Sequence, residues 1–336
     1  MFLTQPLSLR TFSIHNRLVL PPMATEKSVG EGEVSEGLFD YYREKTAGGY
    51  FGLVITEHSY INKEGQASVG QVSVSRDTDI EGLKRLVEVV HASGSKVIAQ
   101  INHAGGKAIC ALDGSVTAPA PTGMPYITTR GEAVEAHTMS QAEIDQVIVD
   151  FAAAARRVKA AGYDGVEIHS AHGYLLNQFY SPISNRREDS YTGKTIEGRT
   201  RLHCQVISAV REAVGPDFLV ALRLGACDYQ EGGSTQADAV AACKIFETAG
   251  IDLLDISGGL CGYRGDGSKI PGYFGNESQA IREAVSVPVI LTGGVRTGLA
   301  AETLLEEGKA DLIGVGRSVL KDSLWAKKAF AELGIE

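Results

Sequence analysis

The sequence of 336 residues contains no run of about 18 apolar residues, the length that a membrane-spanning helix requires. No basic segment followed by an apolar core opens the chain, so we expect no secretion or organelle import and predict a cytoplasmic protein. Positive charge is also scarce, because 32 basic residues stand against 41 acidic residues and give a net charge of -9. This balance offers no basic footprint for nucleic acid or for an anionic membrane surface.

Cysteine and linker sequences are scarce as well. The five cysteines are widely spaced and form no Cys-x-x-Cys pair, so a zinc or iron–sulfur site is disfavoured and we predict no metal. No Pro/Ser-rich stretch divides the chain, and 43% hydrophobic with 22% charged residues is typical of a globular protein. We therefore expect a single domain over residues 1–336.

Eight short apolar runs recur along the chain, each followed by a loop and then by a segment with a helical pattern. This alternation predicts parallel strands joined by helices, and eight such units favour a closed α/β barrel, the (β/α)₈ TIM barrel, over a doubly wound sheet. The predicted strands are 17–22, 52–56, 96–101, 165–169, 218–224, 253–256, 288–291 and 311–315. The predicted helices include 36–47, 80–92, 140–161 and 196–214.

Two segments fall outside the strand–helix repeat. Alternation in Thr11–Ile14, within residues 1–16, predicts a short N-terminal hairpin that covers the amino-terminal mouth of the barrel. The loop 105–139 after the third strand is too long for a simple connector. Loops of this length usually form lids or binding walls.

Three groups that can carry protons leave the end of the fourth strand together: His169, His172 and Tyr174. In a barrel of parallel strands this end holds the active site. Either histidine alone could be an ordinary buried residue, and His-x-x-His without a third ligand is weak evidence for zinc. The remaining interpretation is a pair of donors that polarise a carbonyl oxygen, with Tyr174 as a proton source.

Glycine-containing turns follow the last two strands, where barrels bind phosphate. They are Gly293-Gly294 and, two residues after Gly314, Gly316-Arg317. Each could be a tight turn, but together they indicate a phosphate-bearing ligand, because glycine lets backbone amides approach an anion and arginine adds charge.

Two polar residues stand on predicted strands where an aliphatic side chain would pack more easily, Gln100 and Arg223. A buried guanidinium without a partner would be costly. Arg223 could be neutralised by a nearby acid, or it could face an anionic cofactor ring such as a reduced flavin, with the Gln100 amide at its pyrimidine edge.

At this point the sequence resembles the Old Yellow Enzyme family of flavin-dependent ene-reductases over nearly its whole length. The segments that carry the resemblance are Asn16–Met23, Gln100–Gly105, His169–Tyr174, Ser181–Arg187 and Ala310–Arg317. The resemblance implies that FMN is the cofactor and NADH or NADPH the reductant.

The resemblance also implies roles for individual residues. The residues implied to contact FMN are Pro21, Pro22, Met23, Ala24, His58, Gln100, Arg223, Gly294, Gly316 and Arg317. The first four would lie along the isoalloxazine, Gln100 and Arg223 at its pyrimidine edge, and the last three at the phosphate. His169 and His172 would bind the carbonyl oxygen of an α,β-unsaturated substrate, and Tyr174 would protonate its α-carbon. Lys107 matches a lysine near the site in one branch, although a solvated surface position is an equal alternative.

The chain departs from the family pattern at several positions. Ala24 replaces a common Thr or Cys that tunes the flavin, with Thr25 beside it; Glu26 replaces a tyrosine; and His58 replaces a small residue. Substrate preference therefore cannot be transferred from the family. Because the chain ends at Glu336 without the cysteine-rich segment of related dienoyl-CoA reductases, we expect no iron–sulfur cluster.

The sequence thus predicts an FMN enzyme that transfers hydride from NAD(P)H to the activated C=C bond of a small enone. Two alternatives stay open: a phosphosugar isomerase or aldolase barrel, and a protein that stores or senses flavin without turnover. The choice of nicotinamide, the physiological alkene and assembly into a homo-oligomer are left open by the sequence.

Overall fold

The computed structural model describes residues 1–264 and 269–335, and eight parallel strands form its centre. They close into a barrel in the order β10-β11-β12-β13-β14-β3-β4-β5, with β14 pairing β3 to complete the ring. The barrel strands are β3 (Leu18–Leu20), β4 (Leu53–Tyr60), β5 (Lys96–Asn102), β10 (Gly165–Ser170), β11 (Leu219–Cys227), β12 (Leu253–Gly258), β13 (Val289–Thr292) and β14 (Leu312–Gly314). All eight predicted strands and the barrel are confirmed.

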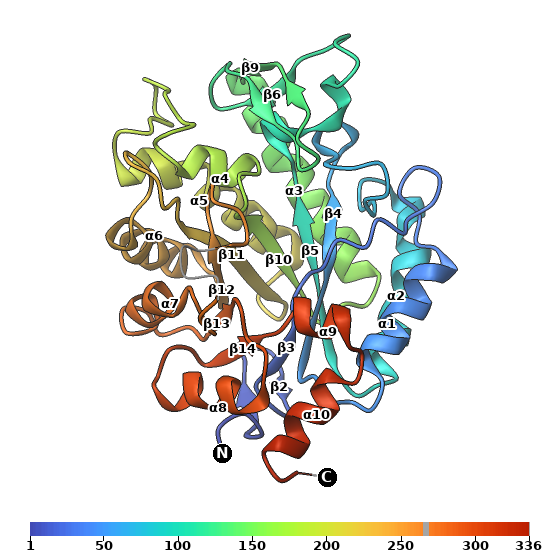
Figure 1. Ribbon diagram of the computed structural model, residues 1–336. Coiled ribbons are helices and arrows are strands. Elements are labelled where there is room, and N and C mark those ends of the chain that lie inside the picture. Colours follow the sequence, from blue (N-terminus) through green and yellow to red (C-terminus); the bar gives the residue numbers. More distant parts are fainter. Residues whose placement is uncertain (265–268, 336) are drawn as a thin grey trace.

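Helices surround the barrel on its outside (Figure 1). They are α1 (Glu36–Thr46), α2 (Ile80–His91), α3 (Gln141–Ala160), α4 (Leu175–Tyr180), α5 (Ile196–Val214), α6 (Gln236–Ala249), α7 (Gly275–Arg282), α8 (Gly298–Glu306), α9 (Arg317–Lys321) and α10 (Trp325–Glu332). The four predicted helices are present with ends shifted by at most one residue. The capping box at Ser140, in which Ser140 and Glu143 bond each other's backbone N–H groups, opens α3.

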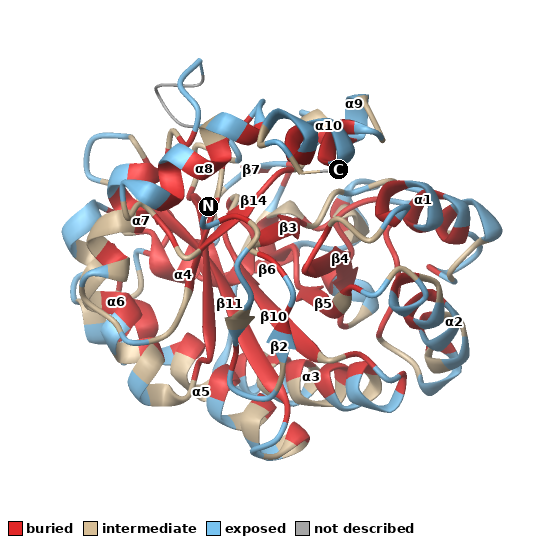
Figure 2. Ribbon diagram, turned by 90° about the horizontal axis from the view of Figure 1, so that it is seen from below, coloured by how far each residue is buried: buried red, intermediate tan, exposed pale blue. Residues whose placement is uncertain are grey.

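Two layers of apolar side chains hold these elements together. The larger layer lies between strands and helices, and Figure 2 shows the strands buried while the helices expose one side. A second cluster fills the amino-terminal end of the barrel and includes Val19, Leu53 and Ile290. The predicted hairpin, β1 (Leu7–Ser8) paired with β2 (Ser13–Ile14), covers that cluster with Ile14. The amino-terminal mouth is therefore closed, and ligands must enter from the carboxyl ends of the strands.

The loop 105–139 contains short elements that form a separate cap at the carboxyl end of β5 (Figure 1). Two short 3₁₀ turns, Gly105–Lys107 and Ile109–Ala111, precede two small sheets. In these sheets β6 (Ala118–Ala120) pairs β9 (Ala136–Thr138), and β7 (Tyr126–Ile127) pairs β8 (Ala133–Val134). Residues of the β7–β8 turn line the cavity described below, so the segment forms a wall.

Candidate functional site

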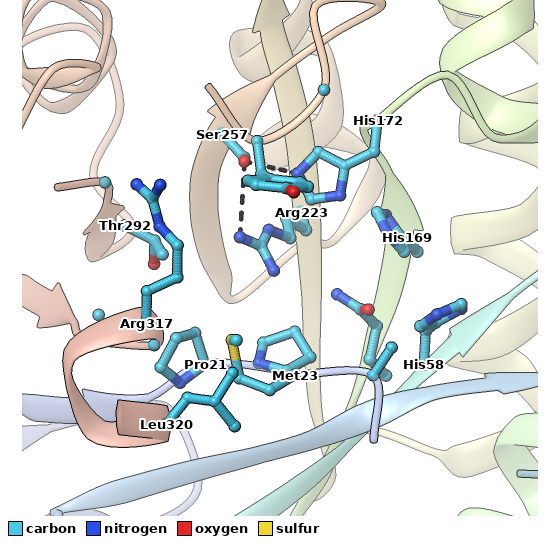
Figure 3. Close-up of a pocket in the computed structure, with 18 of the residues that line it drawn as sticks. Pro21, Met23, His58, His169, His172, Arg223, Ser257, Thr292, Arg317 and Leu320 are labelled. Carbon is cyan, nitrogen blue, oxygen red and sulfur yellow. Dashed lines mark hydrogen bonds between the residues drawn. The ribbon is translucent and has the colours of Figure 1, made fainter. Parts of the chain in front are cut away.

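A cavity of about 1170 Å³ opens at the carboxyl ends of the barrel strands (Figure 3). Single ligand sites commonly measure about 300–1,000 Å³, so this cavity has room for a cofactor and a second molecule. Every residue that the sequence predicts for the site lines it. These residues are Pro21, Pro22, Met23, Ala24, His58, Gln100, Lys107, His169, His172, Tyr174, Arg223, Gly294, Gly316 and Arg317.

His169 and His172 meet at the end of β10, with ring centres 5.1 Å apart and nearly perpendicular planes. The backbone N–H of Ala171 donates to Nδ1 of His169 over 3.2 Å, so a neutral His169 carries its proton on Nε2. Burial, and then the neighbouring His172, hold the pKa of His169 well below its ordinary value. His169 is therefore a neutral donor.

His172 is held differently, by Ser257 at the end of β12. Its Nε2 lies 2.8 Å from the Ser257 hydroxyl, which also lies 3.5 Å from Nη2 of Arg223. A serine hydroxyl has one hydrogen and two lone pairs, so Ser257 can accept from Arg223 and either donate to Nε2 of His172 or accept from it. Burial and Arg223 lower the pKa of His172 well below its usual range. A backbone φ of 61° at His172 shows that the loop is bent sharply to place this ring.

Tyr174 completes the group, with its ring centre 5.1 Å from that of His169. Burial raises the pKa of its phenol above the ordinary value, so the group keeps its proton at neutral pH. The Lys107 ammonium donates to the main-chain carbonyl of His172 over 2.9 Å and lies 5.9 Å from the Tyr174 ring centre. Sequence analysis left two alternatives for Lys107, a position near the site and a solvated surface position. In the structure Lys107 lines the cavity.

Gln100 and Arg223 project into the barrel from β5 and β11, each beside an acid on a neighbouring strand. Gln100 donates to Glu167 over 2.7 Å, and Nε of Arg223 lies 3.1 Å from Asp255. The strand register aligns both pairs. Burial and the charge of Asp255 raise the pKa of Glu167 to about 8. The neutralising acid that sequence analysis considered for Arg223 is therefore present, and Arg223 still lines the cavity.

The opposite end of the cavity is built from glycines and Arg317. Gly294 has a φ of 68°, and a side chain there would lie 2.8 Å from the Tyr273 ring and 2.9 Å from a backbone carbonyl. Only glycine suits that position. Arg317 donates to the Tyr273 hydroxyl over 2.8 Å, and its guanidinium lies 5.8 Å from the Tyr263 ring centre. Two aromatic side chains thus hold the cation beside the backbone amides of the glycine turns.

His58 lies near the end of β4, with its ring centre 5.4 Å from that of Tyr174 and 6.0 Å from that of His169. The sequence places it at the cofactor, and the structure adds this contact with the proton-carrying group. Other lining residues were missed: Ser257, Thr292, Tyr263 and Tyr273. Ser257 and Thr292 stand at strand ends, a signal that could have identified them. The tyrosines lie in the β12–α7 loop, whose path the sequence does not reveal.

Clustered metal ligands and membrane-spanning helices are both absent from residues 1–264 and 269–335. No group of three or more His, Cys, Asp or Glu side chains is placed there to hold a metal ion. No helix in this part of the chain combines the length and apolar character needed to cross a membrane.

Comparison with known proteins adds independent evidence. The model of the NADH:flavin oxidoreductase / NADH oxidase family matches residues 2–335. An NADPH dehydrogenase of Bacillus licheniformis is 36% identical, over 98% of this chain and 94% of its own length. An NADH oxidase of Thermoanaerobacter brockii is 35% identical over 94% of this chain, but the match covers only 48% of that protein. The chain thus spans about half the length of some relatives that it matches.

A solved structure agrees with these sequence relatives. The Old Yellow Enzyme homologue from Zymomonas mobilis superposes with a TM-score of 0.84 at 25% identity, covering 99% of this chain and 94% of its own.

The cavity suits the cofactor that this family uses. The glycine turns and Arg317 offer amides and a cation to a phosphate, Pro21 and Met23 form an apolar floor, and Arg223 offers a buried cation to the ring (Figure 3). The chain therefore belongs to the NADH:flavin oxidoreductase / NADH oxidase family, the family of the Old Yellow Enzymes, and FMN is its cofactor.

Proposed function

We propose that this protein is an NAD(P)H:flavin oxidoreductase that reduces the activated C=C bond of α,β-unsaturated carbonyl compounds. The observation that carries the proposal is the convergence of His169, His172 and Tyr174, with centroid distances of 5.1 Å from His169 to each of the other two rings. Two neutral N–H donors beside a protonated phenol suit an acceptor that gains negative charge on oxygen and a proton on carbon.

The two histidines act on the carbonyl oxygen. His169 offers Nε2–H. In the proposal the Ser257 hydroxyl donates to Nε2 of His172, which leaves Nδ1–H of His172 as the second donor to the same oxygen. Their hydrogen bonds strengthen as negative charge develops on that oxygen, and such a donor contributes about 3 kcal/mol to transition-state stabilisation. Because both rings are neutral, this stabilisation does not require their protonation.

Tyr174 supplies the proton. Its buried phenol stays protonated at neutral pH, and its ring centre lies 5.1 Å from that of His169. We place the α-carbon of the acceptor near this hydroxyl. General-acid catalysis of this kind commonly contributes on the order of 10²- to 10⁴-fold in rate. Lys107 orders the segment by holding the carbonyl of His172.

The remaining residues orient the cofactor. When bound, FMN would supply the hydride-transfer chemistry between NADH or NADPH and the acceptor, and Gln100, Arg223 and Arg317 would hold it. Arg223 presents a buried positive charge whose Nε lies 3.1 Å from Asp255, and Gln100 is fixed by its bond to Glu167. These contacts hold the amide and the guanidinium in place before the cofactor binds, which lowers the entropy cost of binding.

Two half-reactions measured separately test the proposal. Under anaerobic conditions NADH or NADPH should bleach the visible absorbance of the FMN-loaded protein, and 2-cyclohexenone should then restore it. Bleaching without reoxidation by cyclohexenone, nitroalkenes or dienoyl thioesters would contradict reduction of activated alkenes. Failure of both nicotinamides to bleach the flavin would instead favour a storage or sensor protein.

A further inference from the structure

His58 is a third imidazole on the wall of the cavity, at a position where the family resemblance leads us to expect a small residue. Its exposed fraction is 9%, and it lines the cavity from the end of β4. The resemblance implies a contact between His58 and FMN, but the steps proposed for the acceptor use only His169, His172 and Tyr174. A buried polar ring in that place therefore needs its own explanation.

The hydrogen bonds behind His58 fix its tautomer. Gln71 cannot be flipped, because its Oε1 accepts from the Ala67 N–H over 2.6 Å and its Nε2 donates to the carbonyl of His58 over 3.2 Å. The same Nε2 lies 2.8 Å from Nδ1 of His58, and the Asn102 amide nitrogen lies 3.3 Å from that atom. Since both neighbours are donors, Nδ1 is the acceptor and the proton of His58 resides on Nε2.

The proton on Nε2 has no acceptor within the described residues, 1–264 and 269–335. Burial, followed by the charge of Arg223, lowers the pKa of His58 to about 4, so the ring is neutral at working pH. His58 thus offers one uncharged N–H donor to whatever fills the cavity. A ligand oxygen that meets this donor gains a hydrogen bond in a cavity shielded from bulk water, which increases its affinity.

The three imidazoles form a row with His169 in the middle. His172 is 5.1 Å from His169 between ring centres, and His58 is 6.0 Å from it, beside Tyr174. Figure 3 shows His58 and His172 separated along the same wall, with His169 between them. His169 and His172 share one oxygen in the proposed function, so the donor of His58 lies apart from that oxygen and on the side of the proton source.

We propose that His58 donates to a second oxygen of the acceptor, so that the site prefers alkenes activated from both ends, such as an ene-1,4-dione. This inference rests on the proposed function. In the reaction the C=C π bond is replaced by two C–H bonds, one from hydride that originates in NAD(P)H and one from a proton. NAD(P)H is oxidised to NAD(P)⁺, and both carbonyl groups survive.

The test compares two acceptors that differ by one carbonyl, 2-cyclohexene-1,4-dione and 2-cyclohexenone. The quantity measured is the ratio of their kcat/KM values, which cancels general damage to a variant. His58→Phe keeps a ring against Tyr174 but removes the donor, and His58→Gln keeps an N–H donor. We expect the ratio to fall by about three- to tenfold in His58→Phe, as loss of one hydrogen bond implies, and to stay within about threefold of the parent in His58→Gln.

A binding measurement provides a readout without turnover. The oxidised, FMN-loaded protein is titrated with 1,4-cyclohexanedione and with cyclohexanone, followed by the flavin spectrum, and His58→Phe should weaken only the preference for the dione. His15→Phe, at an exposed histidine outside the cavity, serves as the control and should keep the parent ratio. An unchanged ratio in His58→Phe would overturn the inference. So would equal losses for both acceptors together with a shifted flavin midpoint potential, since His58 would then serve the cofactor. If the parent protein reduces neither acceptor, the proposed function fails, and the titration still decides the role of His58.

Discussion

At the scale of single residues, the chemistry of this site depends on which nitrogen of each ring carries a proton. Backbone and side-chain donors behind the rings make that choice: Ala171 for His169 and Gln71 for His58. Neither choice needs a charged partner. The result is a set of neutral donors in a buried cavity, where hydrogen bonds to a developing oxyanion are stronger than in water.

Replacement of Tyr174 by Phe separates the two half-reactions. The phenol is proposed to protonate the acceptor carbon and takes no part in hydride transfer from the nicotinamide. We expect flavin reduction within about threefold of the parent rate and alkene reduction slower by about 10²-fold or more, in line with general-acid catalysis. Anaerobic stopped-flow measurement of each half-reaction checks this. Equal slowing of both steps would argue against a proton-donor role.

At the scale of elements, the barrel was predictable because each strand is a short apolar run, and because strand–helix alternation fixes parallel order. The polar residues within strands, Gln100 and Arg223, were also predictable, since a polar residue in an apolar strand stands out. Contacts between loops could not be predicted from the sequence. Arg130 forms an ion pair with Glu26, which lies 104 residues earlier in the sequence, and no local pattern marks such a pair.

The Glu26–Arg130 ion pair joins two loops over the cavity, the one after β3 and the β7–β8 turn. The two charged groups are 2.7 Å apart, and both residues line the cavity. With side-chain exposures of 43% for Glu26 and 55% for Arg130, the pair contributes little to stability but can restrict entry. We expect Arg130→Gln to raise kcat/KM for a bulky enone relative to 2-cyclohexenone by about two- to fivefold.

Charge reversal supplies the control for that pair. Glu26→Arg combined with Arg130→Glu should restore the parent selectivity, whereas each single reversal should not. Salt near 0.5 M should move the parent toward the Arg130→Gln value, because exposed charges are screened. Selectivity that is insensitive to both treatments would show that the pair does not control entry.

At the scale of the whole molecule, burial of ionisable groups links stability to pH in two opposite directions. Five histidines have pKa values lowered chiefly by burial: His58, His103, His169, His172 and His203. Three acids have pKa values raised chiefly by burial: Glu57 to about 7, Glu167 to about 8, and Asp255. The histidines bind fewer protons in the folded state than in the unfolded state, and the acids bind more.

These signs predict a maximum of stability near pH 6.5. Below about pH 6.5 the unfolded chain protonates its histidines while the folded chain does not, so stability falls as pH falls. The buried acids contribute stability that is fully present below about pH 4.5, and it is lost as pH rises through 7 to 8. Between about pH 4.5 and 6.5 the five histidines change the free energy of unfolding more than the three acids change it in the opposite direction. Above about pH 6.5 only the acids change it. Urea unfolding at pH 5.0, 6.5 and 8.0 with excess FMN should therefore give the largest free energy at pH 6.5.

Glu167→Gln isolates one of these contributions. Glutamine resembles the protonated acid and can still accept from Gln100, so the fold should tolerate it. Without the titrating carboxyl, the loss of stability between pH 6.5 and 8.0 should become smaller, and the loss between pH 6.5 and 5.0 should become larger. Glu81→Gln, at an exposed position of α2, should leave both slopes at their parent values. If the Glu167→Gln variant kept the parent dependence of unfolding free energy on pH, Glu167 would ionise in the folded protein as it does in the unfolded chain. The barrel interior would then hold an additional negative charge beside Arg223, which its burial does not lead us to expect.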